Sequence, residues 1–227
     1  MNSAAIISNS ALSPTVRRLA LRVDADFRFQ AGQFVILPVP PAPGSEPDAK
    51  PGKGFYSVAS PPGILPTLEL LVEHREGGGW VSAWISARGP GEQLKLEGPL
   101  GHFGLMPGVP PGPRAFLCQR AGLAPLRSML MQGLAEGAGE HWLFLGGAGR
   151  ADWLLHEEWE ALAADHPAFH YRPLAGGGAE LAAAAAAALP RQSQAYLAGF
   201  SADVAAAQAG LLAAGFEAAS MKIEKFG

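Results

Sequence analysis

The chain of 227 residues contains a single cysteine, Cys118, and only 16% charged residues. One thiol excludes a disulfide within the chain, a zinc site built from several cysteines and a cysteine-ligated iron–sulfur cluster held by this chain alone. The 17 basic residues are outnumbered by 20 acidic ones, and a net charge of -3 offers no basic field to a nucleic-acid backbone. We therefore expect no metal site and no nucleic-acid partner.

Long hydrophobic runs are also lacking. The longest uninterrupted apolar run covers residues 181–189, far short of the roughly 20 residues that a membrane helix needs. The first twelve residues have no basic segment followed by a long apolar stretch, so a secretory signal is not expected. With 48% hydrophobic residues, the chain can build a globular core. These features predict a soluble, cytoplasmic protein without membrane insertion.

Glycine (29 residues) and proline (20 residues) are plentiful, which indicates many turns. In the first half, apolar residues gather in short runs between these turns. The runs that predict strands are 16–23, 34–37 (ended by Pro38), 55–60, 68–73 and 93–96, and residues 80–85 have the spacing of a short helix. Short strands joined by turns predict a small antiparallel β-barrel.

The second half changes character after the proline- and glycine-rich stretch 107–113, which we interpret as a linker. Apolar runs now alternate with longer helical patterns. Strands are predicted at 115–118, 142–145, 169–172 and 195–197, and helices at 124–134, 154–164, 180–189 and 202–214. This alternation predicts βαβ units around a parallel sheet. We expect two domains, an antiparallel barrel over residues 1–110 and an α/β domain over residues 111–227.

Two segments of the first half have the residue types of a ligand site. Residues 54–60 place aromatic rings and two hydroxyls on one extended segment, where a ring can stack on a planar heterocycle and a hydroxyl can bond its nitrogen. Glycines 77–79 precede a helix start, which brings backbone N–H groups close to a phosphate, with Ser82 as a further donor. Taken singly, these segments are better explained as core aromatics and a plain glycine turn.

The order of the segments along the chain is more specific than any one of them. The ordered set consists of Phe29–Phe34 (FQAGQF), Phe55–Ser60 (FYSVAS), Gly79–Ser82 (GWVS), Gly98–Phe103 (GPLGHF), Gly122–Leu130 (GLAPLRSML), Phe144–Ala148 (FLGGA), Tyr196–Gly199 (YLAG) and Ile223–Phe226 (IEKF). Together they resemble the ferredoxin–NADP⁺ reductase family, the two-domain FAD and pyridine-nucleotide oxidoreductases. The resemblance covers nearly the whole chain and implies an FAD-binding β-barrel followed by a parallel-sheet nucleotide-binding domain.

The resemblance also implies roles for individual residues. Tyr56 would flank the flavin ring and Ser57 would bond near its reactive nitrogen, which makes these two the expected catalytic residues. The other residues expected around FAD are Phe55, Val72, Glu73, His74, Gly79, Trp80, Val81, Ser82 and Phe226, the last being equally typical of a core ring on an edge strand. Those expected around NADH or NADPH are Gly122, Leu123, Ala124, Pro125, Gly146, Gly147, Arg150 and Gly199.

Three segments of the chain depart from the family pattern. Gly54 stands where the flavin motif usually has an arginine for the FAD pyrophosphate, and only Lys53 beside it is basic. Gln119 and Arg120 stand where the nucleotide loop has glycines, so Arg120 either reaches a phosphate or fills the space that the nucleotide needs. Ala198 replaces the cysteine expected beside Gly199.

By resemblance, the chain is a flavoprotein oxidoreductase that passes electrons between NAD(P)H and a separate redox protein through bound FAD. The acceptor would be an iron–sulfur protein or an oxygenase component. The departures keep a second interpretation open, in which the chain lacks NAD(P)H activity and serves as a protein-to-protein electron carrier or as a regulatory or assembly subunit.

Overall fold

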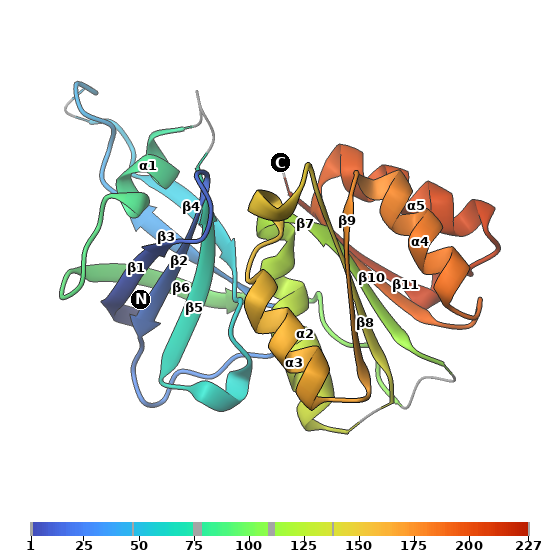
Figure 1. Ribbon diagram of the computed structural model, residues 1–227. Helices are drawn as coiled ribbons and strands as arrows, with labels where there is room; N and C mark the ends of the chain where they lie inside the picture. Colours follow the sequence, from blue (N-terminus) through green and yellow to red (C-terminus); the bar gives the residue numbers. More distant parts are fainter. Residues whose placement is uncertain (1, 47, 75–78, 109–111, 138, 227) are drawn as a thin grey trace.

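The computed structural model describes residues 2–46, 48–74, 79–108, 112–137 and 139–226. Two sheets lie side by side, an antiparallel barrel formed by the first half and a parallel sheet with helices formed by the second (Figure 1). The barrel has the strand order β4-β3-β6-β1-β2-β5, and the second sheet has the order β11-β10-β7-β8-β9. The fold class expected from the sequence is confirmed.

The barrel is a set of short antiparallel strands around an apolar interior. Its elements are β1 (Asn2–Ala11), β2 (Val16–Arg22), β3 (Phe34–Val39), β4 (Gly52–Ser57), the turn η1 (Pro62–Ile64), β5 (Thr67–Glu73), α1 (Trp80–Ser86) and β6 (Gln93–Leu100). A bridge between Val58 and Leu70 joins the end of β4 to β5 and nearly closes the barrel. Alternate apolar side chains of these strands fill the interior, as the period of two requires.

Two barrel strands differ from the sequence prediction. Strand β1 was not predicted, because only Ala4 and Ile6 among its side chains are buried and its apolar alternation is weak. Pairing with β2 and β6 on its two sides places this segment in the sheet. Strand β3 continues through Pro38, which was expected to end it. Because β3 pairs with β6 at Phe34 and Ile36, before Pro38 is reached, the missing N–H of the proline breaks no ladder on that side.

The α/β domain alternates strands and helices as predicted. Its elements are β7 (Arg114–Gln119), η2 (Arg120–Gly122), α2 (Leu123–Ala135), β8 (His141–Gly147), η3 (Arg150–Asp152), α3 (His156–Asp165), β9 (Phe169–Ala175), α4 (Gly178–Ala188), β10 (Gln194–Phe200), α5 (Ser201–Ala213), η4 (Ala218–Ser220) and β11 (Met221–Phe226). All strand pairs are parallel. Helices α2 and α3 cover the face toward the barrel, and α4 and α5 cover the other face (Figure 1).

Strand order fixes where a ligand can enter the parallel sheet. The chain runs outward from β7 to β9 on one side and then continues through β10 and β11 on the other side. The direction of winding therefore reverses between β7 and β10, and open α/β sheets bind ligands at the carboxyl ends of the strands at such a point. The predicted domain boundary at residues 110 and 111 falls outside the described residues, in the stretch between β6 and β7, and stays a prediction.

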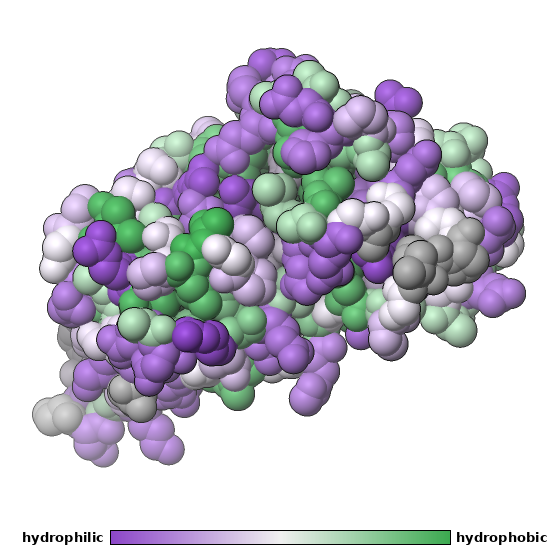
Figure 2. All heavy atoms as spheres, turned by 90° about the horizontal axis from the view of Figure 1, so that it is seen from below, coloured by the Kyte–Doolittle hydropathy of each residue, from purple (hydrophilic) through white to green (hydrophobic). Residues whose placement is uncertain are grey.

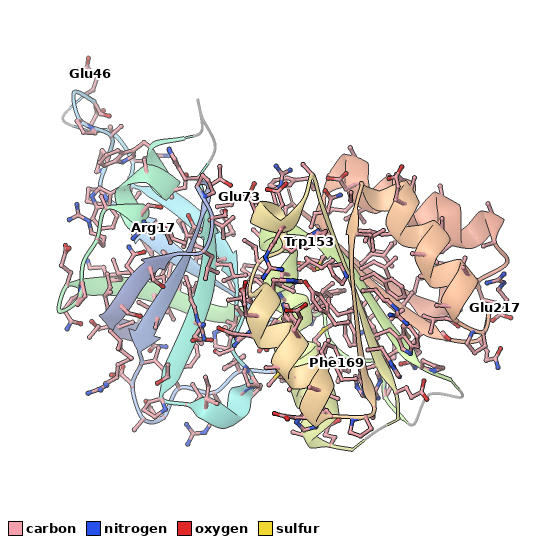
Figure 3. All side chains as sticks on the ribbon, in the orientation of Figure 1. Arg17, Glu46, Glu73, Trp153, Phe169 and Glu217 are labelled. Carbon is pink, nitrogen blue, oxygen red and sulfur yellow. The ribbon has the colours of Figure 1, made fainter. Side chains whose placement is uncertain are left out.

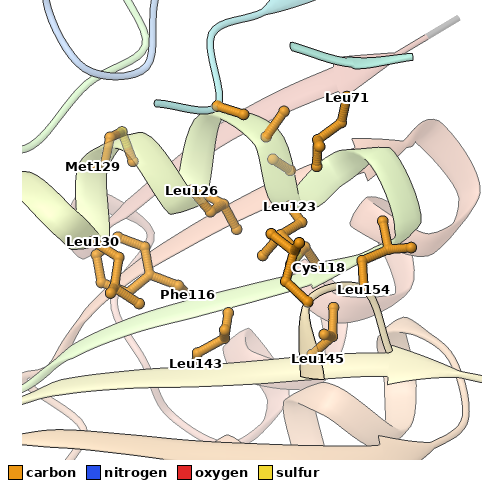
Figure 4. Packing of buried hydrophobic residues seen from close by; sticks show 14 of the residues in the cluster. Leu71, Phe116, Cys118, Leu123, Leu126, Met129, Leu130, Leu143, Leu145 and Leu154 are labelled. Atoms are coloured by element: carbon orange, nitrogen blue, oxygen red, sulfur yellow. The ribbon is translucent and has the colours of Figure 1, made fainter. Parts of the chain in front are cut away.

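One hydrophobic cluster spans the two domains. Leu71 of β5 lies on the barrel side of helix α2 (Figure 4) and belongs to one buried cluster with Leu123 and Leu126 of that helix. Barrel residues Val16 and Phe103 belong to the same buried cluster. Burial of apolar surface across the boundary holds the domains in a single arrangement.

Four charged side chains also join the domains, and we call them the interdomain charge network: Arg18 of β2, Glu69 of β5, Arg127 of α2 and Glu158 of α3. The Glu69 carboxylate accepts from Arg18 Nη2 at 2.6 Å and from Arg127 Nη1 at 2.8 Å. Arg18 Nη1 also donates to Glu158 Oε1 at 2.7 Å. Each arginine contacts both carboxylates and is therefore paired with one from the barrel and one from the α/β domain.

In the part of the chain that the structure describes, none of the helices has both the length and the apolar character needed to span a membrane.

Candidate functional site

A hollow of about 170 Å³ opens between the two domains, and we call it the interdomain hollow. It lies where the barrel faces the carboxyl ends of β7 and β10. Its lining residues are Phe55, Tyr56, Ser57, Leu71 and Glu73 from the barrel and Ala121, Ala124, Phe200 and Phe226 from the α/β domain. Predicted site residues from distant parts of the chain therefore meet in one place.

Strand β4 supplies the first wall. Because successive side chains alternate, Phe55 is 63% exposed, with its ring 6.1 Å from that of Phe34, while Tyr56 turns the other way and is half-buried. Burial raises the pKa of Tyr56 to about 12, so its hydroxyl stays neutral near pH 7. Ser57 is buried, and its hydroxyl makes no hydrogen bond to any other described residue. The wall thus offers a neutral aromatic ring and an available hydroxyl.

The Tyr56 ring occupies the space that a side chain at position 54 would need. A Cβ atom added to Gly54 would overlap the Tyr56 ring, which lies back over the glycine. A side chain at this position would therefore force the tyrosine to move. The neighbouring base, Lys53, has its Nζ 3.4 Å from Glu97 Oε2 and pairs with that carboxylate.

The remaining barrel residues expected around FAD divide into Glu73, which lines the hollow, and the others, which are not among its lining residues. Glu73 lines the interdomain hollow, whereas the Val72 side chain is buried in the barrel core. His74 Nδ1 lies 3.4 Å from Ser82 Oγ, which links the end of β5 to the start of α1. The indole of Trp80 donates to the Pro40 carbonyl at 2.9 Å, and Val81 packs against the barrel core. Gly79 is the residue before this helix, while Gly77 and Gly78 lie outside the described residues.

The loop at Gly122, which the resemblance assigns to the nucleotide, packs its backbone against the backbone at the end of β10. A Cβ atom on Gly122 would overlap the Ala198 carbonyl, so only glycine fits there. Gly199 has a φ of +143°, in the region that favours glycine. Ala124 lines the hollow, while Leu123 and Pro125 are buried in the first turn of α2. The structure therefore brings Gly122 and Gly199 together at the point where the strand order reverses.

The residues at the end of β8 and just after it are placed differently. Added Cβ atoms would crowd the Gly176 carbonyl at Gly146 and the Asp152 side chain at Gly147, so both glycines permit close packing. Arg150 pairs with Glu157 at 2.7 Å and lines a separate hollow beside the β1–β2 turn. Arg150 is therefore not brought to the interdomain hollow.

Phe200 is a lining residue that the sequence did not single out. Its ring stands edge-on to Phe226, with centroids 6.2 Å apart and an interplanar angle of 89°. The signal available in the sequence was its position directly after Gly199 at a strand end. Glu73 faces the α/β domain (Figure 3), where Glu73 Oε2 accepts from the Ala121 N–H at 3.4 Å.

A larger hollow of about 760 Å³ lies near the other end of α2. Figure 2 views the molecule from this lower side, where hydrophobic residues show among hydrophilic ones. The lining of this larger hollow is mainly apolar and includes Phe29, Ile64, Leu105 and Met131. Glu136 is the one titratable residue of that lining. It lies away from the carboxyl ends of the strands and gathers no chemistry comparable to that of the interdomain hollow.

The residues of the interdomain hollow fit the two cofactors that the resemblance implies. A flat, largely apolar ring such as a flavin matches a wall of Tyr56, Leu71 and Phe226 with the available Ser57 hydroxyl beside it. A dinucleotide matches the close backbone approach at Gly122 and Gly199 on the carboxyl edge of the sheet.

Comparisons with known proteins agree with both assignments. Residues 3–104 match the oxidoreductase FAD-binding domain, and residues 116–184 match the oxidoreductase NAD-binding domain. Ferredoxin–NADP reductase B of Sorangium cellulosum is 38% identical over 179 residues, which cover 77% of this chain and 70% of that protein. The reductase component of phenol 2-monooxygenase from a Pseudomonas species is 33% identical over 71% of this chain, which spans only 44% of that protein.

Solved structures share the whole fold. A ferredoxin–NADP⁺ reductase from Neisseria gonorrhoeae with bound FAD and NADP has a TM-score of 0.81 at 19% identity, covering 99% of this chain and 98% of that chain. An Amycolatopsis cytochrome P450 reductase has a TM-score of 0.85 at 26% identity, covering 99% of this chain and 69% of that one. With both cofactor-binding domains present, the protein is an FAD-dependent NAD(P)H oxidoreductase. The chain belongs to the ferredoxin–NADP⁺ reductase family.

Proposed function

We propose that the chain passes electrons between NAD(P)H and a separate redox protein. The observation that carries this proposal is the interdomain hollow, which Tyr56 and Ser57 of the barrel line together with Ala121 and Phe200, the chain neighbours of Gly122 and Gly199. When bound, FAD accepts a hydride from a nicotinamide and releases electrons singly. The single cysteine leaves these 227 residues without a cysteine-ligated cluster, so the electrons pass to a redox centre outside them.

The relatives indicate the class of acceptor. They include a ferredoxin–NADP reductase and reductase components of phenol and alkene monooxygenase systems. We therefore propose an iron–sulfur protein or an oxygenase component as the partner. A cytoplasmic location also remains our proposal, and the one buried thiol, Cys118, is compatible with a reducing compartment.

The residues of the hollow act by position and by exclusion of water. The neutral Tyr56 ring and the Phe226 ring form two apolar walls, which keep a flat ligand between them and water out. The Ser57 hydroxyl can donate a hydrogen bond to a ring nitrogen. A Cβ atom on Gly199 would meet no atom closer than 3.9 Å, so the missing side chain leaves room for a second ring to approach from the α/β side.

Substitution of Ser57 tests the placement. Loss of one hydrogen bond of about 1 kcal/mol should slow flavin reduction by NAD(P)H in Ser57→Ala by roughly fivefold to tenfold. Ser3→Ala removes a hydroxyl on the exposed part of the same barrel, where Ser3 bonds Gln93, and should leave the rate unchanged. Equal rates in the two variants would refute the role of Ser57.

A second experiment tests the direction of electron flow. FAD-loaded protein is mixed with NADH or NADPH and with an oxidised iron–sulfur ferredoxin, and ferredoxin absorbance is followed without oxygen. Bleaching of the ferredoxin that requires both this protein and the nucleotide is expected. Flavin that only a reduced iron–sulfur protein can reduce would favour the protein-to-protein carrier instead.

A further inference from the structure

Arg120 has an unusual backbone at a decisive position. Its φ is +45°, a left-handed conformation that costs a non-glycine residue energy and that persists only where the surroundings hold it. It begins the turn η2 between β7 and α2, directly beside the point where the strand order reverses.

The side chain of Arg120 reaches residues on both sides of the interdomain hollow. Its Nε lies 3.5 Å from Glu73 Oε1 on the barrel side. Its guanidinium carbon lies 5.7 Å from the centre of the Phe200 ring on the α/β side, within the range of a cation–π contact. Glu73 and Phe200 both line the hollow. The arginine thus connects one wall to the other.

We propose that Arg120, Glu73 and Phe200 form a latch across the mouth of the interdomain hollow, which the nicotinamide nucleotide must displace. The proposal rests on the function proposed above. Glu73 lies within ion-pair distance of the guanidinium and Phe200 faces it from the other wall, so in this arrangement the arginine spans two lining residues of the hollow and its charge already has a partner. Arg120 is therefore a positioning residue, and it determines the fraction of molecules that are open to the nucleotide.

Removal of the latch should tighten nucleotide binding. The variant is Arg120→Gly with Glu73→Gln, because glycine accepts the left-handed backbone and glutamine places no negative charge beside an anionic ligand. Binding of NAD⁺ and of NADP⁺ to the FAD-loaded protein is measured by calorimetry, and oxidised nucleotides avoid turnover. In the unaltered protein, the ion pair and the cation–π contact together should lower the open fraction by roughly fivefold to tenfold. In the double variant, the dissociation constant of the nucleotide should therefore fall by that factor.

The chain contains a closely matched control. Arg88 pairs with Glu92 at 3.0 Å and lies 4.6 Å from the Trp84 ring centre, yet it stands on the barrel beyond α1. Arg88→Gly with Glu92→Gln removes the same two kinds of contact away from the hollow and should leave the dissociation constant unchanged. Weaker binding in the Arg120 variant would identify the arginine as a phosphate ligand and overturn the latch, and unchanged binding would overturn it as well.

Hydrogen exchange provides a second readout that does not need the nucleotide. The Ala121 N–H donates to Glu73 Oε2 beside the latch, so its exchange should accelerate in Arg120→Gly alone. Unchanged exchange would overturn the latch while leaving the proposed function standing. Failure of every variant and of the unaltered protein to bind either nucleotide would contradict the proposed function and the displacement together.

Discussion

Replacement of Glu69 by glutamine should loosen the attachment between the two domains. The carboxylate is the centre of the interdomain charge network, and its side chain is 9% exposed. It accepts from Arg18 Nε at 2.8 Å and Nη2 at 2.6 Å and from Arg127 Nη1 at 2.8 Å. The substitution keeps the shape of the side chain and removes its charge.

The expected cost follows from what remains around the arginines. The Arg127 side chain is 11% exposed, and after the substitution its other acceptors are the Ala59 carbonyl at 3.0 Å and Glu158 Oε2 at 3.6 Å. Removal of one partner from a buried ion pair typically costs about 3–5 kcal/mol. Because glutamine still accepts one hydrogen bond, we expect a loss near the lower end, about 3 kcal/mol.

Urea unfolding measures this loss, followed by tryptophan fluorescence at constant pH. Arg150→Met is the control, because the Arg150–Glu157 pair is 62% and 77% exposed and exposed pairs contribute about 1 kcal/mol or less. If Glu69→Gln costs no more free energy of unfolding than the control, the charge network does not hold the domains together and the reasoning is refuted.

Three further predictions concern buried groups. Burial of His141 lowers its pKa from 6.5 to about 4, so the unfolded chain binds the proton more tightly than the folded chain. The free energy of unfolding should therefore be highest above about pH 6.5 and fall by about 3 kcal/mol toward pH 4. Urea midpoints should show a flatter pH profile in His141→Gln. Gly122→Ala should lower the free energy of unfolding by about 1–3 kcal/mol and weaken nucleotide binding, because its Cβ would overlap the Ala198 carbonyl. The control is Gly149→Ala, whose Cβ would meet nothing within 4 Å and which should be neutral in the same unfolding and binding assays. Burial raises the pKa of the Cys118 thiol, so an aromatic disulfide reagent should label it at the rate of unfolding, and fast labelling of the folded protein would contradict its placement.

Much of the fold could be predicted because local patterns carried it. The alternation of short apolar runs with helical segments in the second half is a local signal, and the structure has those strands and helices. Strand β1 lacked such a signal, since Ala4 and Ile6 are its only buried side chains and long-range pairing places it. Where pairing partners decide, a segment's own sequence is a weak guide.

The site was predicted in the same uneven way. Ordered motifs pointed to Tyr56, Ser57, Gly122, Gly199 and Phe226, and the structure brings these residues to one hollow or its edge. Their roles toward the cofactors stay predictions. The contacts that join the domains could not be foreseen, because Glu69 and Arg127 are 58 positions apart and no short pattern links them.

The surroundings of Gly54 also could not be foreseen from the sequence. The resemblance indicated an absent arginine, but only the three-dimensional arrangement shows the Tyr56 ring lying over that glycine. Similarly, the unusual backbone of Arg120 and its contacts with Glu73 and Phe200 depend on elements from both domains.

The central claim is that this chain moves electrons from a nicotinamide nucleotide through a flavin held in the interdomain hollow. It is tested most directly by titration of the FAD-loaded protein with NADH and then NADPH in the absence of oxygen, following the visible absorbance of the flavin. Bleaching with one equivalent of one nucleotide is the predicted result. A tightly bound flavin that neither nucleotide reduces would contradict the claim.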